Sequence, residues 1–352
     1  LGGIWDQVGF GFHRYSTDKQ WLVPHFEKML YDQALLAQAY LETYQITKDP
    51  FYSRPAEEIF TYVLRDMTSD EGAFFAAEDA DSEGEEGKFY VWTIEEFRQL
   101  LGEGAAPWER IFNLKKEGNF LEEATGHKTG TNILHLDMSL SQWAKETGVK
   151  EHELEQQWAA VREKLYLERE KRIHPLKDDK VLTNWNGLMI AAFAIGARVL
   201  DKPKYAEAAE RAVHFVLTKM RDDQGRLFHR YRDGETAIIT NAEDYAFFIH
   251  GLLEIYGTTF DPNYLQAALD LQNKMLSDFW DETNGGFFLT EKGSKDLPVR
   301  PKELYDGAIP SANSVALFNL LRLSRMTGVP AWEQKASELT KAFSGTVKNQ
   351  PT

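Results

Sequence analysis

The chain has 352 residues, 43% of them hydrophobic, so it is long enough to bury a large core. Its formal net charge is −15 and it has no long run of Lys and Arg, which argues against nucleic acid or an anionic membrane as a partner. There is no Cys, which excludes disulfides and cysteine metal sites, and no apolar run is long enough to span a membrane.

The spacing of apolar residues predicts four helical hairpins. Each begins with a helix that is apolar on nearly all sides, and we expect these four helices to be buried inside, at 26–44, 184–200, 243–256 and 311–328. Each is followed by an amphipathic helix that we expect outside, at 51–67, 204–220, 263–279 and 331–343. The period of about 60 residues indicates a repeated unit of inner helix, short turn and outer helix.

The connections alternate in the same way. Turns within a hairpin are short and contain proline, as in "TKDP", "DKPK", "FDPN" and "GVP". Loops between hairpins are long and place Gly before aromatic residues, as in "DEGAFF", "DQGRLFHRY" and "TNGGFF", with a further copy in the opening "VGFGFHRYS". These loops predict small β-hairpins. The pattern describes a mainly α protein, an α/α toroid whose long loops share one face, where functional residues are expected.

Residues 68–183 interrupt the period. They contain an acidic hairpin, a short helix at 93–101, loop material through Thr131 and a charged helix at 151–172. Because no flexible linker brackets this region, we interpret 1–352 as a single toroid domain with an insertion at about 68–150 and one more outer helix. About ten helices are predicted where six hairpins need twelve, so the last hairpin should expose an apolar flank near Leu317, Leu320 and Leu321.

Polar and aromatic residues crowd the starts of the inner helices. Any one of them could cap a helix for about 1 kcal/mol, but four such clusters on one face suggest a pocket. The candidate catalytic residues are His25, Glu27, Asp32, Asp244 and Asp306. The candidate substrate-binding residues are His13, Arg14, Tyr31, Glu78, Asp79, Asp81, Trp185, Asn186, Glu243, Tyr245, Arg300, Lys302, Glu303 and Asn313. We expect Arg300 and Lys302 to pair with the site carboxylates.

Carboxylates, amides and aromatic rings suit a sugar or another polyol as a small-molecule ligand. Hydrolysis of a glycoside needs two carboxyl groups roughly 5 Å or 6.5–9.5 Å apart, and the residues leave the pair open. Epimerisation needs a group that exchanges a proton near neutral pH, for which His13 and His25 are candidates. The alternative is a module that binds a glycan or peptide without catalysis.

The stretch "AEDADSEGEEG" partly imitates a calcium loop, but Tyr90 stands where the twelfth-position Glu should be. We therefore expect no metal there and place Glu78, Asp79 and Asp81 at the rim of the pocket. No phosphate loop, HExxH pair or GxSxG elbow occurs, so no cofactor is expected.

Five motifs carry a resemblance to a known family: "GFHRYSTDKQWLVPHFEKMLYDQALLA", "AEDADSEGEEGKFYVW", "LTNWNGLMIAA", "EDYAFFIHGLLEIY" and "RPKELYDGAIPSANSVA". In this order they resemble the YyaL-like, thioredoxin-domain-containing spermatogenesis-associated proteins. One departure is Ala312, where the family usually has Gly.

The resemblance implies a toroid akin to six-hairpin glycosidases and N-acylglucosamine 2-epimerases, which continues beyond Thr352. It also implies an upstream thioredoxin-like domain of the same polypeptide, absent from this sequence. It implies no settled reaction. We expect a cytoplasmic protein, although the sequence starts at Leu1 and any targeting signal could precede it.

Overall fold

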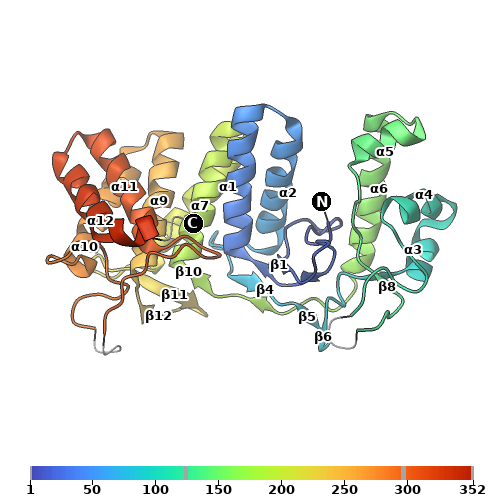
Figure 1. The fold of residues 1–352 in the computed structure, drawn as a ribbon, viewed down its shortest axis with the longest axis horizontal. Helices are drawn as coiled ribbons and strands as arrows, with labels where there is room; N and C mark the ends of the chain where they lie inside the picture. The colour runs from blue at the N-terminus through green and yellow to red at the C-terminus, as the bar shows by residue number, and fades with distance from the viewer. Residues whose placement is uncertain (1, 123–125, 295–298, 350–352) are drawn as a thin grey trace. The chain divides into compact units, whose positions relative to one another are not determined.

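The computed structural model describes residues 2–122, 126–294 and 299–349 (Figure 1). Its internal contacts divide the chain into two compact units. One contains Leu30–Ala76 and Asp179–Thr352 and is called here the hairpin unit. The other contains Leu1–Met29 and Ala77–Asp178 and is called the mixed unit, because it combines helices with short strands.

The hairpin unit consists of four helical hairpins in a row. The inner helices contact one another in chain order and are α1 (Leu30–Thr47), α7 (Thr183–Val199), α9 (Ala242–Thr259) and α11 (Ala312–Thr327). Each packs against the outer helix that follows it, which is α2 (Pro50–Asp66), α8 (Pro203–Lys219), α10 (Pro262–Phe279) or α12 (Pro330–Asn349). All four predicted hairpins are confirmed, and so is the α/α-toroid fold class.

Burial separates inner from outer helices as predicted. Every residue of α7 from Asn186 to Ala197 is buried, whereas α8 buries one stripe that includes Tyr205, Ala209 and Val216. The inner helices approach closely because glycines face each other. A Cβ on Gly187 would lie 2.5 Å from the backbone of Phe247, and one on Gly251 would lie 2.7 Å from the Gly187 carbonyl oxygen. Side chains at these two positions would force α7 and α9 apart.

The short turns explain where the outer helices begin. Each outer helix has proline at its first position, where the missing N–H costs no intrahelical hydrogen bond: Pro50, Pro203, Pro262 and Pro330. The carboxylates of Asp49 and Asp261 cap two of these helices by accepting from the amides of Phe51 and Asn263. A tight, capped turn therefore sends the chain back along its own inner helix.

The Gly-aromatic loops of the hairpin unit form small hairpins closed by single β-bridges, as predicted. The bridges join Thr68 to Phe74, Arg221 to Leu227 and Trp280 to Phe287. After the second of these bridges the chain continues into a three-stranded antiparallel sheet. Its strands are β10 (Val181–Leu182), β11 (Phe228–Arg232) and β12 (Glu235–Ile239), in that order.

A side chain from the next inner helix fixes each of these hairpins. Asn186 accepts from the Phe74 amide at 2.9 Å and donates to the Phe74 carbonyl at 2.9 Å. Asn313 makes the same two bonds with Phe287, at 2.8 and 3.0 Å. In the middle hairpin the hydroxyl of Tyr245 accepts from the Leu227 amide at 3.3 Å. These three side chains bind the loop face to the helices.

The mixed unit has its own aromatic core, in which Phe97, Trp108, Phe112, Trp143 and Trp158 are buried together. The helices around it are α3 (Ile94–Leu101), a 3-10 turn (Gly102–Gly104), α4 (Ala105–Ile111), α5 (Leu140–Thr147) and α6 (Glu151–Arg169). The short antiparallel strands are β1 (Tyr15–Ser16) with β2 (Pro24–His25), β3 (Lys28–Met29) with β4 (Ala77–Glu78) and β9 (Lys177–Asp178), β5 (Asp81–Ser82) with β6 (Glu85–Glu86), and β7 (Trp92–Thr93) with β8 (Thr131–Asn132).

Three expectations about elements are wrong. Helix α1 begins at Leu30 rather than 26, because Lys28 and Met29 pair as a strand with Glu78 and Ala77. The region expected to be loop through Thr131 contains α4, which the nearby glycines hid in the sequence. Helix α5 was also missed, although its capping box of Ser139 and Gln142 is visible in the sequence.

Two further expectations, about helix α6 and about the apolar flank of α11, agree with the structure only in part. Helix α6 was expected as an outer helix of the toroid, and the structure packs it against α3 and α5 within the mixed unit. On α11, Leu321 is 39% exposed and the neighbouring Phe318 is 52% exposed, which agrees with an apolar flank. Leu320 is fully buried, contrary to the expectation, because the helix turns this position toward its neighbours.

Candidate functional site

A buried carboxylate joins three elements of the hairpin unit. Asp244, in the first turn of α9, is fully buried and accepts the amides of Asn184 at 3.1 Å and Asn241 at 2.9 Å. Its Oδ1 lies 2.9 Å and its Oδ2 3.1 Å from Nδ1 of His229 on β11. Asp244 therefore fixes the orientation of His229 and the tautomer that carries a proton on Nδ1.

His229 is the side chain beside Asp244 that is best suited to proton transfer. Its side chain is 20% exposed, and its Nε2 makes no hydrogen bond with the described residues. Burial by itself lowers the pKa of His229, but the hydrogen bond and negative charge of Asp244 outweigh this, so the pKa is raised above its usual value. A histidine oriented in this way can take up and return a proton near neutral pH.

Glu243 supplies a second titratable group beside the pair. It is half-buried, and burial, reinforced by the negative charge of Asp244, raises its pKa. The side-chain amide of Asn184 donates to it at 3.4 Å and opposes the shift. A carboxyl group with a raised pKa is protonated over a wider pH range and can act as a proton donor.

Aromatic rings lie at the starts of the neighbouring inner helices. Trp185, in the first turn of α7, meets Tyr31 of α1 edge-on, with ring centroids 4.8 Å apart. Trp185 is half-buried, whereas Tyr31 is buried. Tyr31, Trp185, Glu243 and Asp244, all predicted as site residues, thus lie at the starts of three successive inner helices, in the order α1, α7 and α9.

Most of the other predicted site residues of the hairpin unit make hydrogen bonds with backbone groups of that unit. Asn186, Asn313 and Tyr245 hold the Gly-aromatic hairpins as described above, and burial raises the pKa of Tyr245 to about 12. Asp306 is exposed and accepts the Ser311 amide at 2.7 Å, just before α11. Glu303 is exposed and its carbonyl oxygen accepts from Asn313 at 2.7 Å. Asp32 is half-buried in the first turn of α1.

The two predicted cations do not pair with the predicted site carboxylates. Lys302 binds Asp281 at 2.6 Å and the Gly285 carbonyl at 2.6 Å, so it stabilises the third Gly-aromatic hairpin. Arg300 donates to the carbonyl oxygens of Thr290 and Asp278 and lies over the Phe288 ring. The expectation was wrong because the hairpin beside this segment offers nearer acceptors.

In the mixed unit, the predicted residues near the N-terminus form a partly exposed series of ion pairs. His25 lies 2.7 Å from Glu86 through Nδ1 and 3.1 Å from Glu27 through Nε2, and its ring stacks on Tyr15. Arg14 donates to Glu27 at 2.9 Å. Both ring nitrogens of His25 are therefore occupied by carboxylates.

The remaining predicted residues of the mixed unit do not gather at one point. Glu78 is buried 3.9 Å from Lys177, while Asp79 and Asp81 are exposed. His13 is buried and its Nδ1 lies 2.9 Å from the Phe26 carbonyl oxygen. Burial, together with the positive charge of Lys28, lowers the pKa of His13 to about 3, so it is neutral at physiological pH.

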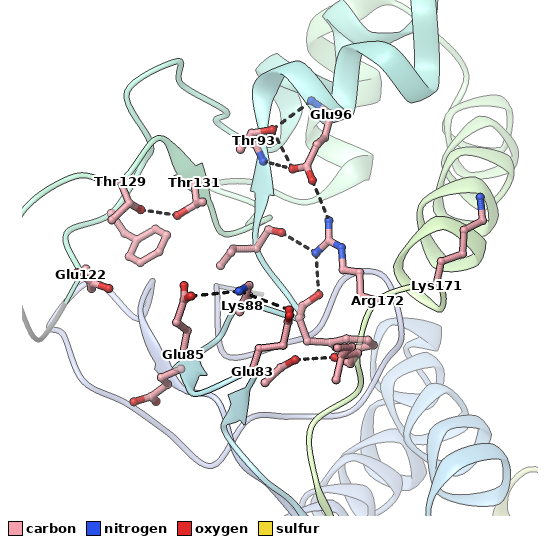
Figure 2. A pocket seen from close by; sticks show the side chains of 16 residues that line it. Glu83, Glu85, Lys88, Thr93, Glu96, Glu122, Thr129, Thr131, Lys171 and Arg172 are labelled. Atoms are coloured by element: carbon pink, nitrogen blue, oxygen red, sulfur yellow. Dashed lines mark hydrogen bonds and ion pairs between the residues drawn. The ribbon is translucent and has the colours of Figure 1, made fainter.

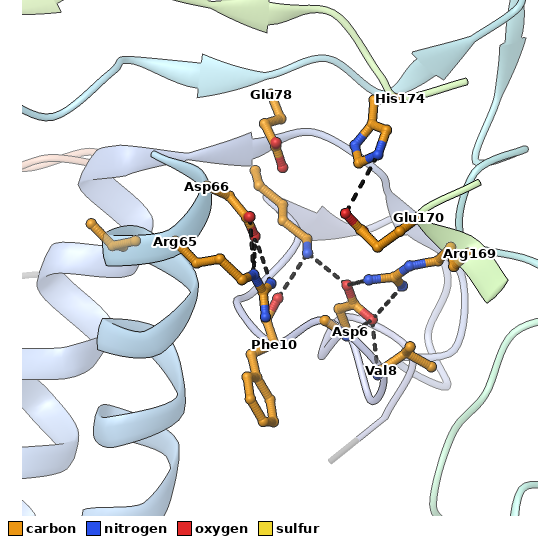
Figure 3. A network of polar contacts seen from close by, with 12 residues as sticks. Asp6, Val8, Phe10, Arg65, Asp66, Glu78, Arg169, Glu170 and His174 are labelled. Atoms are coloured by element: carbon orange, nitrogen blue, oxygen red, sulfur yellow. Dashed lines mark hydrogen bonds and ion pairs between the residues drawn. The ribbon is translucent and has the colours of Figure 1, made fainter. Parts of the chain in front are cut away.

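A buried ion network underlies this part of the mixed unit (Figure 3). Asp6 receives Lys28 at 2.7 Å and both terminal nitrogens of Arg169 at 2.8 and 2.9 Å. All three side chains are less than 5% exposed. Its Oδ1 also accepts the amides of Val8 and Gly9 at 3.0 Å each. Asp6 thereby ties the opening loop to β3 and α6.

The sequence analysis missed His229, and a signal for it was present. The tetrapeptide Phe-His-Arg-Tyr occurs twice, at Phe12–Tyr15 and Phe228–Tyr231. Both copies follow a Gly-aromatic turn, and only the first was considered. The structure buries the first histidine, His13, and leaves the second partly exposed beside Asp244.

Within the described residues, no three His, Asp or Glu side chains gather closely enough to hold a metal ion. None of the described helices combines the length and the apolar character needed to cross a membrane.

The row of inner and outer helices, with a polar cluster at the starts of the inner ones, defines an α/α-toroid protein. A solved GH76 alpha-mannanase from Bacteroides thetaiotaomicron shares this fold, with a TM-score of 0.52 and 10% identity, covering 90% of this chain and 61% of that chain. No protein-family model matches the chain.

The sequence comparisons confirm the family resemblance. Human spermatogenesis-associated protein 20 is 39% identical over 99% of this chain and 48% of its own length. The protein B0495.5 of Caenorhabditis elegans is 32% identical over 99% of this chain and 51% of its own length. The chain is similar to these proteins over nearly all of its own length and spans about half of theirs.

Proposed function

We propose that the chain catalyses proton transfer on a sugar or a similar polyol, isomerising or epimerising it at the cluster of His229, Asp244 and Glu243. The observation that carries this proposal is the orientation of His229, whose Nδ1 is bound by the buried carboxylate of Asp244 while Nε2 makes no hydrogen bond with the described residues. Such a histidine is a suitable general base.

In this proposal Nε2 of His229 removes the proton from the carbon next to the carbonyl of an open-chain sugar. Glu243 in its protonated form donates its proton to the carbonyl oxygen, which yields an enediol. The protonated His229 then returns its proton to either carbon of the enediol while the Glu243 carboxylate takes up a hydroxyl proton, which gives the ketose or one of the two aldose epimers without any external oxidant. Trp185 and Asn184 suit the recognition of sugar C–H faces and hydroxyl groups.

Proton transfer is favoured over glycoside hydrolysis, which needs two carboxyl groups that both reach the substrate. Asp244 is fully buried and its oxygens already accept from two amides and from His229. It is therefore a positioning residue, and of the three residues of the cluster only Glu243 offers a partly exposed carboxyl group, whose pKa the nearby exposed Glu303 also raises.

The test incubates the chain in D2O with glucose, mannose, fructose, N-acetylglucosamine and cellobiose. NMR follows the appearance of new sugars and of deuterium at the carbon next to the carbonyl, which is C2 in the aldoses and C1 or C3 in fructose. We expect exchange with at least one sugar, and a loss of about 100-fold or more in His229→Gln and Glu243→Gln. The matched controls are His214→Gln and Glu207→Gln, which change exposed residues of α8 and should retain activity. Exchange that survives in His229→Gln, or hydrolysis of nitrophenyl glycosides without exchange, would overturn the proposal.

A further inference from the structure

A cavity of about 650 Å³ lies in the mixed unit, and all of its lining residues belong to that unit. The β5–β6 hairpin, the start of α3 and residues 171–173 after α6 form its walls, together with Phe120, Glu122, Thr129 and Thr131 (Figure 2). The volume lies within the range of roughly 300–1,000 Å³ typical of small-molecule sites. None of its lining residues was a predicted site residue, and the proposed reaction does not use it.

The cations of the cavity wall are already bound to carboxylates. Lys88 lies 3.1 Å from Glu85 and 3.4 Å from Glu83, and Lys171 lies 2.7 Å from Glu168. Arg172 lies 3.8 Å from Glu96, and its Nη1 donates to two backbone carbonyl oxygens at 2.8 Å. A ligand with a phosphate or sulfate group would have to compete with these carboxylates for each cation.

The same pairing disfavours a strongly cationic ligand. Glu83 and Glu85 share Lys88, and Glu86 binds His25 at 2.7 Å. The wall as a whole has five glutamates and three basic side chains, so it offers ammonium donors, carboxylate acceptors and hydroxyl groups with a small net negative charge. Hydroxyl groups of a ligand both donate and accept, so they fit such a mixture better than an ion does.

Apolar surface and hydroxyl groups complete the lining. Phe120 and Val91 are half-buried and face the cavity as part of its lining. Thr129 and Thr131 bond each other through their hydroxyls at 2.6 Å, which fixes both of them at the wall. Aromatic and aliphatic carbon beside fixed hydroxyls matches the alternating C–H and O–H surface of a sugar.

We propose that this cavity of the mixed unit binds a neutral oligosaccharide, at a site composed of different residues from those of the proposed catalytic cluster. The inference stands on the mixed unit alone and does not require the proposed reaction. Through this cavity the protein would bind an oligosaccharide whether or not the catalytic cluster acts on it.

The test measures binding of maltotriose, cellotriose, mannotriose and chitotriose to the chain by saturation-transfer NMR and calorimetry. The comparison probes are glucose 6-phosphate and the basic tripeptide Lys-Phe-Lys. We expect at least one trisaccharide to bind, and Phe120→Ala and Glu85→Gln to weaken that binding about fivefold or more. Glu85 is exposed, so Glu85→Gln remains informative if Phe120→Ala fails to fold.

The matched controls are Leu167→Ala and Glu103→Gln, which change exposed residues of the mixed unit outside the cavity and should bind like the wild type. His229→Gln should also bind like the wild type, which separates this site from the proposed catalytic one. The proposal is overturned if no trisaccharide binds, if the cavity variants bind it unchanged, or if the phosphate or the basic peptide binds in preference.

Discussion

Asp244 of α9 holds His229 of β11 through a hydrogen bond of 2.9 Å between Oδ1 and Nδ1, although the two residues are 15 positions apart in the chain. Two backbone amides fill the rest of the acceptor capacity of Asp244, and the carboxylate is inaccessible. The pair is therefore a fixed feature of the fold, in which one buried carboxylate sets the orientation of a partly exposed histidine.

The pair predicts how His229 titrates. In the wild type the pKa of His229 should lie above the usual 6.5, because Asp244 stabilises the protonated ring more than burial opposes it. Asp244→Asn should lower this pKa, since the negative charge is lost. NMR titration of the His229 ring measures both values. Asp270→Asn, at an exposed position of α10, should leave the titration unchanged, and an equal pKa in wild type and Asp244→Asn would contradict the assignment.

The loss of Asp244 should also destabilise the hairpin unit. Asp244→Asn replaces one carboxylate oxygen by an N–H₂ group that cannot accept, so a buried backbone amide or the His229 ring loses its partner. We expect a cost of about 1–3 kcal/mol in urea unfolding. A cost within about 0.5 kcal/mol, as expected for Asp270→Asn, would show that the network relaxes without loss.

The hairpin clamps predict a large effect for two asparagines. Asn186→Ala leaves the buried amide and carbonyl of Phe74 without partners, and Asn313→Ala does the same to Phe287. Each should lower the free energy of unfolding by about 2–4 kcal/mol. Asn273→Ala, on the exposed face of α10, is the matched control and should change it by about 0.5 kcal/mol or less. Urea unfolding monitored by circular dichroism distinguishes the outcomes.

His13 predicts acid sensitivity of the mixed unit. Its folded pKa of about 3 lies below the unfolded value of 6.5, so below pH 6.5 the unfolded chain binds a proton that the folded chain does not. Stability contributed by the neutral ring is therefore complete above pH 6.5 and is lost as the pH falls, by about 2 kcal/mol at pH 5.

The check is the stability difference between pH 7.5 and 5.0 in wild type and His13→Asn, whose side-chain amide can still donate to the Phe26 carbonyl. The variant should lose less stability on acidification than the wild type. His214→Asn, an exposed control on α8, should follow the wild type. The same loss in all three proteins would assign the acid sensitivity to other groups.

The ion network predicts an asymmetry between its members. Asp6→Asn leaves the buried Lys28 and Arg169 without the carboxylate that both bind, at a cost of about 3–5 kcal/mol. Lys28→Met retains the bidentate pair of Asp6 and Arg169 and should cost less. Equal losses in the two variants, measured by thermal and urea unfolding, would contradict the central role of Asp6.

Helix positions and layers could be predicted from the sequence because they depend on local patterns. The alternation of all-round apolar helices with striped ones separated inner α7 and α9 from outer α8 and α10. Proline at the first helical position marked each outer helix. Local patterns failed at α1, where Lys28 pairs with Glu78, a contact between residues 50 positions apart that no local period reports.

The candidate site was predictable only in part. The crowding at the helix starts identified Glu243, Asp244 and Trp185, because their position in the first turn is a local property. It did not separate these residues from Asn186 and Asn313, which stand at similar positions and hold loops. Which atoms each side chain meets depends on loops from elsewhere in the chain.

The two copies of Phe-His-Arg-Tyr show which properties of the site can be predicted from the sequence and which require the folded structure. That a histidine follows each Gly-aromatic turn, at His13 and at His229, can be read directly from the amino-acid order. Their chemistry depends on the folded structure, since His13 is buried beside Lys28 and kept neutral, whereas His229 remains partly exposed against Asp244, which raises its pKa. The two histidines differ because the pKa of a side chain depends on the charge and solvent around it, and distant segments of the chain supply both.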